Sequence, residues 1–338
     1  GAFVLGAFAD AVGRRRAMFL CVLLSTVGMS VTGLVESFSL LVAVRFITGF
    51  GAGSVLALST VLVSEAFNTG RRAVLVGILI NAFPVGFIIA GLIASSQGDW
   101  RVAYQIAALT LFLPVLVLAV VRESDMWSAA ARQGKVSVAE ITAAPHRRDL
   151  LIGVTLFGSM LVGLWAVFAW MPAWVNHISA PEAAQSNRAM VNIMLGAGSV
   201  AGGLFSGLLS DRLGRRAASA IAYLGCICMT LLIFQTQQQP GSLLFGSTFM
   251  ISFFIGINQG VLSGYIPELF PTRLRGAATG IAMNAGRLLT AGTVFFVGVL
   301  ISTLGGYENA ISVFGLAYLI GLAALYWARE TRGSMLPE

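Results

Sequence analysis

Charge is the scarcest feature of this sequence. Only 10% of its 338 residues are Asp, Glu, Lys or Arg, 57% are hydrophobic, and the mean hydropathy is +0.87. Soluble globular proteins carry roughly 25% charged residues. This composition excludes a soluble enzyme and a disordered chain, and it excludes a nucleic-acid binder despite the net charge of +7. A chain of membrane-spanning helices remains.

Cysteine and histidine are also few, at three and two residues. Cys226 and Cys228 lie close together, but no histidine or further cysteine near them completes a metal site. The sequence also has no nucleophile–base pair and no phosphate-binding loop. We therefore expect no disulfide framework, no metal, no cofactor and no enzymatic activity.

Long apolar runs dominate what is present. A helix needs about 20 apolar residues to cross a hydrocarbon core of roughly 30 Å. Ten stretches are long enough, and residues 1–9 resemble the end of an eleventh, so we expect the natural chain to begin upstream. A long link, 122–149, separates an N-terminal part (1–121) from a C-terminal part with a short tail (150–338). The ten stretches are 17–36, 39–66, 73–95, 102–121, 150–176, 189–210, 217–235, 242–267, 277–303 and 307–328.

The basic residues predict the orientation in the membrane. All but four of the 21 Lys and Arg residues fall in links that would share one side. Arg101 and Arg188 are on the opposite side, and Arg45 and Arg287 lie inside spans. Because cytoplasmic loops are rich in Lys and Arg, the long link and the C-terminus are predicted to be cytoplasmic.

The chain contains an internal repeat. GAFADAVGRRR at 6–16 matches GLLSDRLGRR at 207–216, and residues 64–82 match 267–285. RESD at 122–125 similarly matches RETR, which follows the last span. Two halves with the same topology and both ends on one side indicate a parallel repeat, which occurs in several transporter folds. The paired positions include Asp10/Asp211, Glu65/Glu268, Arg72/Arg275 and Asn81/Asn284.

These motifs resemble those of the major facilitator superfamily. Its loop signature, G-x-x-x-D-x-x-G-R-R/K, matches residues 6–15 and 207–216. PELFPTRLRG at 267–276, ESDMW at 123–127 and ETRG at 330–333 resemble versions found in sugar porters and metabolite:proton symporters. The resemblance covers the whole chain. It implies an all-α membrane protein with two six-helix halves related by pseudo-two-fold symmetry, here from the second helix onward with the first helix missing.

The repeated loop is predicted to act as a gate. A carboxylate at the end of a span can accept hydrogen bonds from the N-terminal amides of an adjacent helix, where the helix dipole favours a negative charge. The resemblance implies that these acids and arginines pair when the protein faces outward and separate when it faces inward. Alternatively, the arginines only anchor the interface. The predicted gating residues are Asp10, Gly13, Arg14, Glu65, Arg72, Asp211, Gly214, Arg215, Glu268 and Arg275.

Arg287 is the strongest substrate-binding candidate. It lies ten residues into its span, roughly 15 Å deep, and no acid occupies a mid-span position in the chain. An unpaired charge at that depth needs water or an anion, and a guanidinium fits a carboxylate. Pairing with carbonyl groups, or with an acid on the missing helix, is the alternative. Arg45, in the pattern R-x-x-x-G-x-G, is either the helix-four arginine of the family or a packing residue.

Further candidates are aromatic and amide side chains. Trp165 and Phe168 are three residues apart and share a helix face, so we expect them to form a cavity wall. Trp174 fits a belt of aromatic residues at the membrane interface. The amide side chains could contact substrate or bond between helices. These amide candidates are Asn81, Asn258, Gln259 and Asn284.

The sequence thus predicts a secondary active transporter that moves a small organic anion, preferably a carboxylate, by alternating access. Proton symport is implied by the resemblance alone. A neutral sugar porter is the alternative, and a non-transporting receptor or assembly subunit of the same fold is a third possibility. We expect a multi-pass monomer in the plasma (inner) membrane, whose partners are the substrate, protons and the lipid bilayer.

Overall fold

The computed structural model describes residues 1–66, 75, 78–96, 99–123, 138–237, 239–271 and 274–332. The regular structure of these residues is helical, without strands. Nine of the described helices are long and apolar enough to cross a membrane. A tenth span is possible if Ala277–Phe295 and Val297–Thr303, which meet at a 41° bend, count as one. The all-α, multi-pass architecture is therefore confirmed.

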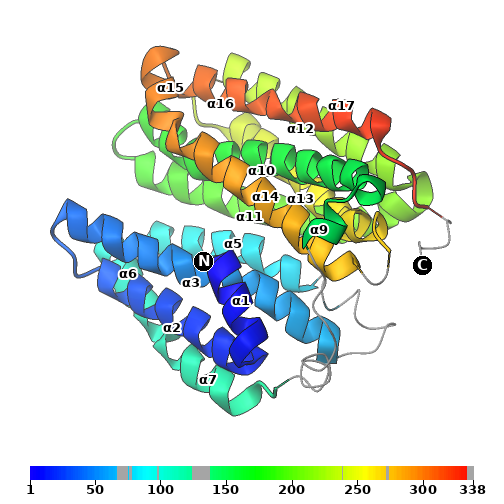
Figure 1. The fold of residues 1–338 in the computed structure, drawn as a ribbon. Helices are drawn as coiled ribbons and strands as arrows, with labels where there is room; N and C mark the ends of the chain where they lie inside the picture. The colour runs from blue at the N-terminus through cyan, green and yellow to red at the C-terminus, as the bar shows by residue number, and fades with distance from the viewer. Residues whose placement is uncertain are drawn as a thin grey trace. The chain divides into compact units, whose positions relative to one another are not determined.

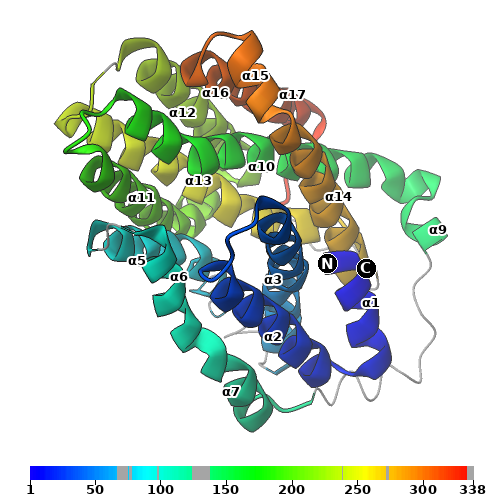
Figure 2. The same cartoon turned by 90° about the vertical axis from the view of Figure 1, so that its left-hand side faces the viewer.

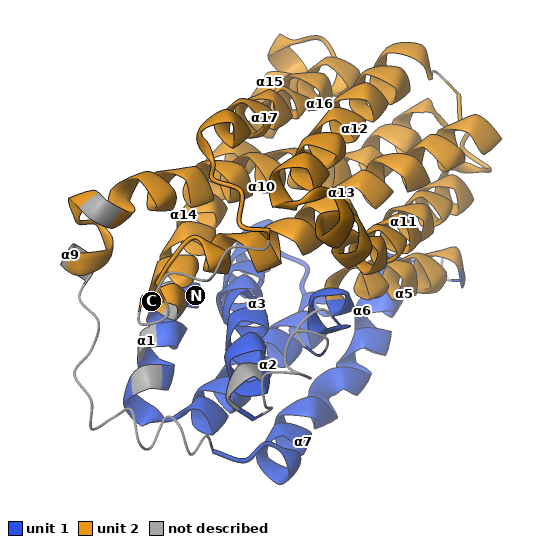
Figure 3. Ribbon diagram, turned by 90° about the vertical axis from the view of Figure 1, so that its right-hand side faces the viewer, with its two compact units in different colours: residues 1–82, 96–135 blue, residues 83–95, 136–338 orange. Residues whose placement is uncertain are grey.

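The described helices fall into two compact units (Figure 3). The first unit comprises Gly1–Ala82 and Ser96–Lys135. In this unit α2 packs along α3, and α6, η1 and α7 continue one another as a single span. Its described helices are α1 (Ala2–Val12), α2 (Arg14–Thr32), α3 (Phe38–Ala66), α6 (Trp100–Ala107), η1 (Ala108–Phe112) and α7 (Leu113–Val120).

The second unit comprises Phe83–Ser95 and Val136–Glu338. Figures 1 and 2 show α10 running through this unit, with α14 crossing it. The described helices are α5 (Ala82–Ser96), α9 (Val138–Ile141), α10 (Ala144–Ile178), α11 (Ala184–Leu213), α12 (Arg215–Thr236), α13 (Ser242–Glu268), α14 (Arg275–Phe295), α15 (Val297–Thr303), α16 (Tyr307–Gly315) and α17 (Ala317–Trp327).

Small residues set the packing of the second unit. Helices α11 and α13 approach so closely that a Cβ atom at Gly202 would overlap the carbonyl oxygen of Phe253. A Cβ atom at Gly256 would overlap that of Ser199. Between membrane helices such close approach replaces the hydrophobic effect, which drives little association there because lipid tails are as apolar as leucine.

The division differs in detail from the expected halves. Residues 83–95, expected in the N-terminal half, group with the second unit. The last residues of the expected linker, 144–149, already belong to α10. Residues 124–137 lie outside the described part of the chain, so the linker stays a prediction.

Candidate functional site

The repeated loop of the second unit makes a sharp junction at Gly214. Helix α11 ends at Leu213, α12 begins at Arg215, and Gly214 between them has φ +91°. Residues with a side chain rarely adopt this left-handed region. A Cβ atom at Gly214 would also lie 2.7 Å from Oε2 of Glu330. Both backbone conformation and space therefore require glycine in this motif.

Glu330 caps the helix that follows. Its carboxylate accepts hydrogen bonds from the backbone N–H groups of Arg215 at 2.9 Å and Arg216 at 3.0 Å, the first two residues of α12. These amides have no partner within the helix, and the helix dipole favours an anion there. Burial raises the pKa of Glu330, but hydrogen bonds from four backbone N–H groups outweigh it, so the pKa is lowered below its ordinary value.

The Arg215 side chain contacts two other predicted gating residues, Asp211 and Glu268. Its guanidinium lies 3.0 Å from Asp211 and donates to both carboxylate oxygens of Glu268, at 3.2 and 3.1 Å. Thr331 also donates to Glu268. Asp211 is 75% exposed, so solvent screens its pair with Arg215 and little stability comes from it. The bidentate contact with Glu268 is the stronger interaction.

The first unit repeats the glycine junction and the glutamate cap. Gly13 has φ +112° between α1 and α2, and Glu123 accepts from the backbone N–H groups of Arg14 at 2.7 Å and Arg15 at 3.3 Å. The two capping glutamates, Glu123 and Glu330, are 207 residues apart. Both loops thus end in a helix capped by a glutamate from the segment after the unit's last span.

A second pair of contacts is also repeated. The Arg216 side chain donates to the carbonyl oxygen of Leu325 near the end of α17, at 3.1 Å. In the first unit Arg15 donates to the carbonyl oxygen of Leu118 in α7. These arginines bind the C-terminal ends of helices, where the dipole favours a cation.

Glutamates outside the predicted gating set accept these amides. Glu330 accepts them at the second loop, where Asp211 pairs with the Arg215 side chain. In the first unit Glu123 accepts them. Both glutamates lie in the repeated RESD and RETR motifs.

Several predicted gating contacts cannot be followed. The side chains of Asp10 and Glu65, and all of Arg72, lie outside the described part of the chain. Arg275 donates from Nε to the carbonyl oxygen of Phe270 at 3.4 Å. Their gating roles stay predictions.

Arg287 and Asn284 come together on α14. One terminal nitrogen of Arg287 donates to Oδ1 of Asn284 at 3.0 Å, and the arginine is partly buried. Within the described residues no carboxylate pairs with Arg287, and its other N–H groups have no partner. At this level Gly286 of α14 meets Gly158 of α10. The site is therefore a partly buried cation with one neutral partner.

An aromatic cluster joins α10 to α5. Phe168, only 2% exposed, lies 4.8 Å from Phe87 and 6.1 Å from Phe83 between ring centroids. Trp165 is partly buried, 5.9 Å from Phe83. Trp165 and Phe168 therefore belong to the same aromatic cluster. Their role as a cavity wall stays a prediction. The sequence reasoning missed Phe83 and Phe87, whose four-residue spacing signals a common helix face.

The other amide candidates are on or near other helices. Asn258 is fully buried on α13, and neither polar atom of its side chain has a hydrogen-bond partner among the described residues. It lies beside the Tyr223 hydroxyl at a geometry short of a hydrogen bond. Gln259 is partly buried on the same helix, and Asn81 is partly buried just before α5. Their substrate contacts stay predictions.

Arg45 contacts its neighbours within the first unit. From α3 it donates to the hydroxyl of Thr32 and to the carbonyl oxygen of Gly28, the latter at 3.5 Å. Its guanidinium also lies 5.0 Å from the ring centroid of Tyr104, a cation–π contact. These contacts to α2 and α6 favour a packing residue over a substrate contact.

Trp174 is not an interface residue, and that prediction is wrong. Its side chain is fully buried, its Nε1 donates to Oε1 of Glu308 at 2.7 Å, and its ring lies 4.9 Å from that of Phe234. A position near the end of a span does not by itself mean contact with the headgroups. Here Trp174 fixes α10 against α16.

Comparisons with known proteins agree with this architecture. The model of the Major Facilitator Superfamily matches residues 1–293. A "Probable 4-methylmuconolactone transporter" of Cupriavidus pinatubonensis is 26% identical, covering 98% of this chain and 79% of its own. The "Cis,cis-muconate transport protein" of Acinetobacter baylyi is 28% identical, with 92% and 77% covered.

A solved structure, that of a D-xylose-proton symporter, has the same fold. It aligns with a TM-score of 0.80 at 20% identity, covering 99% of this chain and 86% of its own. Two halves with matching loop motifs, about ten spans and the family match over most of the chain lead to one conclusion. The chain belongs to the major facilitator superfamily and is a multi-pass membrane transporter.

Proposed function

We propose that this transporter moves a small organic anion bearing a carboxylate, by alternating access. The observation that carries the proposal is Arg287, a partly buried guanidinium whose described surroundings contain no carboxylate partner. Charge within a membrane span is costly and is usually retained for function. A substrate carboxylate would neutralise this cation when the transporter is loaded.

The geometry around Arg287 supports a carboxylate over a neutral ligand. Asn284 occupies one terminal nitrogen and holds the guanidinium in place. The edge formed by Nε and the second terminal nitrogen is left for a planar, bidentate acceptor. A neutral sugar would bring hydroxyl groups but would leave the positive charge unbalanced.

The aromatic cluster and the relatives support the same substrate class. Trp165 and its phenylalanine neighbours form an aromatic surface that suits a flat, unsaturated organic body. The relative from Acinetobacter baylyi is named for cis,cis-muconate, a dicarboxylate, and the one from Cupriavidus pinatubonensis for 4-methylmuconolactone. Both names fit an organic acid with an unsaturated carbon skeleton.

The remaining parts of the proposal follow the family. The transporter works as a proton symporter in the plasma membrane, as a monomer, with the long linker and the C-terminus in the cytoplasm. The capped loops at Gly13 and Gly214 then lie on the cytoplasmic side, and their ion pairs break as that side opens. A neutral sugar porter is the second candidate, favoured by the PELFPTRLRG and ETRG motifs.

Uptake into proteoliposomes tests the proposal. We would measure initial uptake of labelled cis,cis-muconate and labelled D-xylose, each with and without an inward proton gradient. We expect muconate uptake that the gradient accelerates, and no xylose uptake above empty liposomes. Xylose uptake without carboxylate uptake, across a panel of mono- and dicarboxylates, would reverse the substrate assignment. Muconate uptake unaffected by the gradient would remove proton coupling but keep the anion.

A further inference from the structure

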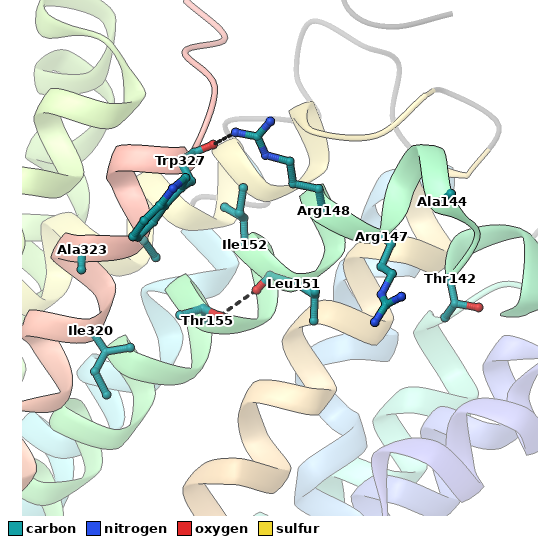
Figure 4. A pocket seen from close by; sticks show the side chains of 11 residues that line it. Thr142, Ala144, Arg147, Arg148, Leu151, Ile152, Thr155, Ile320, Ala323 and Trp327 are labelled. Atoms are coloured by element: carbon teal, nitrogen blue, oxygen red, sulfur yellow. Dashed lines mark hydrogen bonds between the residues drawn. The ribbon is translucent and has the colours of Figure 1, made fainter.

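A groove lies between α10 and α17 in the second unit, near the start of one helix and the end of the other (Figure 4). Its volume is about 880 Å³. It is remote in sequence from Arg287 and contains none of the predicted gating residues. Nothing in the proposed transport mechanism uses it.

The groove is polar at one end and apolar along its length. Arg147 and Arg148 line the polar end, where Arg148 donates to the carbonyl oxygen of Trp327 at 3.1 Å (Figure 4). Leu151 and Ile320, both more than half exposed, line the apolar part. The groove thus combines two cations with a hydrophobic channel, Arg148 toward Trp327 and Arg147 on the side away from Trp327 (Figure 4).

The two arginines are available to an anion. Both are exposed, and the Arg147 side chain has no hydrogen-bond or ion-pair partner among the described residues. The neighbouring acid, Asp149, is paired with Arg329 at 3.3 Å, so it does not neutralise them. Among the described residues, no carboxylate pairs with either arginine at this end of the groove.

The polar end falls at the level of the lipid headgroups. Helix α10 has 35 residues, a length of roughly 52 Å against a hydrocarbon core of about 30 Å. Its first turns, with Arg147 and Arg148, therefore extend beyond the hydrocarbon. Trp327 ends α17 at the same place and is 58% exposed, as expected for an interfacial tryptophan.

We propose that this groove binds one anionic phospholipid. The positive charges of Arg147 and Arg148 attract the phosphodiester, and an acyl chain lies along the apolar side chains Leu151, Ile152, Ile320 and Ala323. Guanidinium groups match phosphate oxygens in geometry and charge. Basic pockets between membrane helices at the membrane surface are known to suit such headgroups. Free phosphate would engage the arginines but leave the apolar channel unfilled.

Native mass spectrometry of the purified full chain tests this site. The protein would be titrated with phosphatidylglycerol or phosphatidylcholine, with inorganic phosphate as a competitor. We expect one phosphatidylglycerol to bind more tightly than phosphatidylcholine. Replacing both arginines (Arg147→Gln with Arg148→Gln) should weaken it about tenfold or more, since each surface arginine contributes about 1 kcal/mol toward anionic lipid. Millimolar phosphate should not displace the lipid.

Two further variants separate the groove from general surface charge. Ala323→Phe fills the channel while keeping both arginines, and it should also weaken phosphatidylglycerol binding. Arg188→Gln removes one positive charge from an exposed position on α11 and should leave binding unchanged. Equal binding of the two lipids, unchanged binding by both the double variant and Ala323→Phe, or displacement by phosphate would overturn the proposal. Unchanged thermal unfolding would show that each variant is folded.

Discussion

Gly214 is the residue at which backbone conformation and helix capping depend on each other. Its positive φ and the nearby Glu330 carboxylate leave no room for a Cβ atom. Gly214→Ala should therefore lower the free energy of unfolding by about 1–2 kcal/mol, the cost of placing alanine at a positive φ. The loss should be larger if the added Cβ atom also displaces the Glu330 cap. Thermal unfolding in detergent measures this.

Gly207 provides the matched control for that prediction. It belongs to the same motif, but a Cβ atom there would meet nothing within 4 Å. Gly207→Ala should leave the stability unchanged or slightly raised, because alanine favours helix. Equal destabilisation by the two substitutions would mean that the junction does not require glycine.

Glu330 gives the stability a predictable pH dependence. Its pKa in the folded protein is lowered, chiefly by backbone N–H donors acting against burial. An unfolded glutamate has a pKa of about 4.3. The cap therefore contributes its full stability above that pH and loses it as the pH falls toward the lower folded value.

Unfolding measured from pH 3 to pH 7, in steps of about one pH unit, gives the contribution of the Glu330 cap to stability. The loss of stability on acidification should be smaller in Glu330→Gln than in the wild type. Glu182→Gln, at an exposed position without a recorded partner in the described residues, serves as the control. Identical pH profiles for wild type and Glu330→Gln would contradict the capping role.

At the scale of the helix, a buried tryptophan links α10 to α16. Trp174 is fully buried and donates to the Glu308 carboxylate. Trp174→Phe keeps the aromatic packing but leaves this carboxylate without its donor, so it should destabilise the protein by about 1.5–3 kcal/mol. Denaturant or thermal unfolding checks the value. Trp100→Phe, at a position 45% exposed, should change it by less than about 0.5 kcal/mol; equal losses would refute the role.

The helices were well predicted because apolar length determines membrane spans. What hydropathy did not predict is how a span is interrupted. The expected stretch 277–303 bends by 41° between α14 and α15, and the span at Trp100–Val120 contains the 3₁₀ turn η1. The hydropathy of an apolar run is the same whether its helix is straight or broken, because side-chain hydropathy carries no information on backbone hydrogen bonding.

For the whole molecule, the repeat predicted matching loops, and the Gly13 and Gly214 loops do share a positive-φ glycine and a capping glutamate. The repeat could not identify the amide-capping acids, because Glu123 and Glu330 lie more than 100 residues from the amides that they accept. The structure brings Arg287 and Asn284 together on α14. Hydropathy gave no information on Phe83 and Phe87, because contacts between distant helices depend on tertiary packing.

The central claim is that a substrate carboxylate neutralises Arg287. The most direct test is the initial rate of labelled cis,cis-muconate uptake, well below saturation, by wild type, Arg287→Gln, Arg287→Lys and the control Arg188→Gln. Loss of a buried charge partner costs at least about 2 kcal/mol, so Arg287→Gln should slow uptake by roughly thirtyfold or more. The uptake rate of Arg287→Lys should lie between those of the wild type and Arg287→Gln. The rate of Arg188→Gln should equal that of the wild type. Wild-type uptake by folded Arg287→Gln would contradict the account.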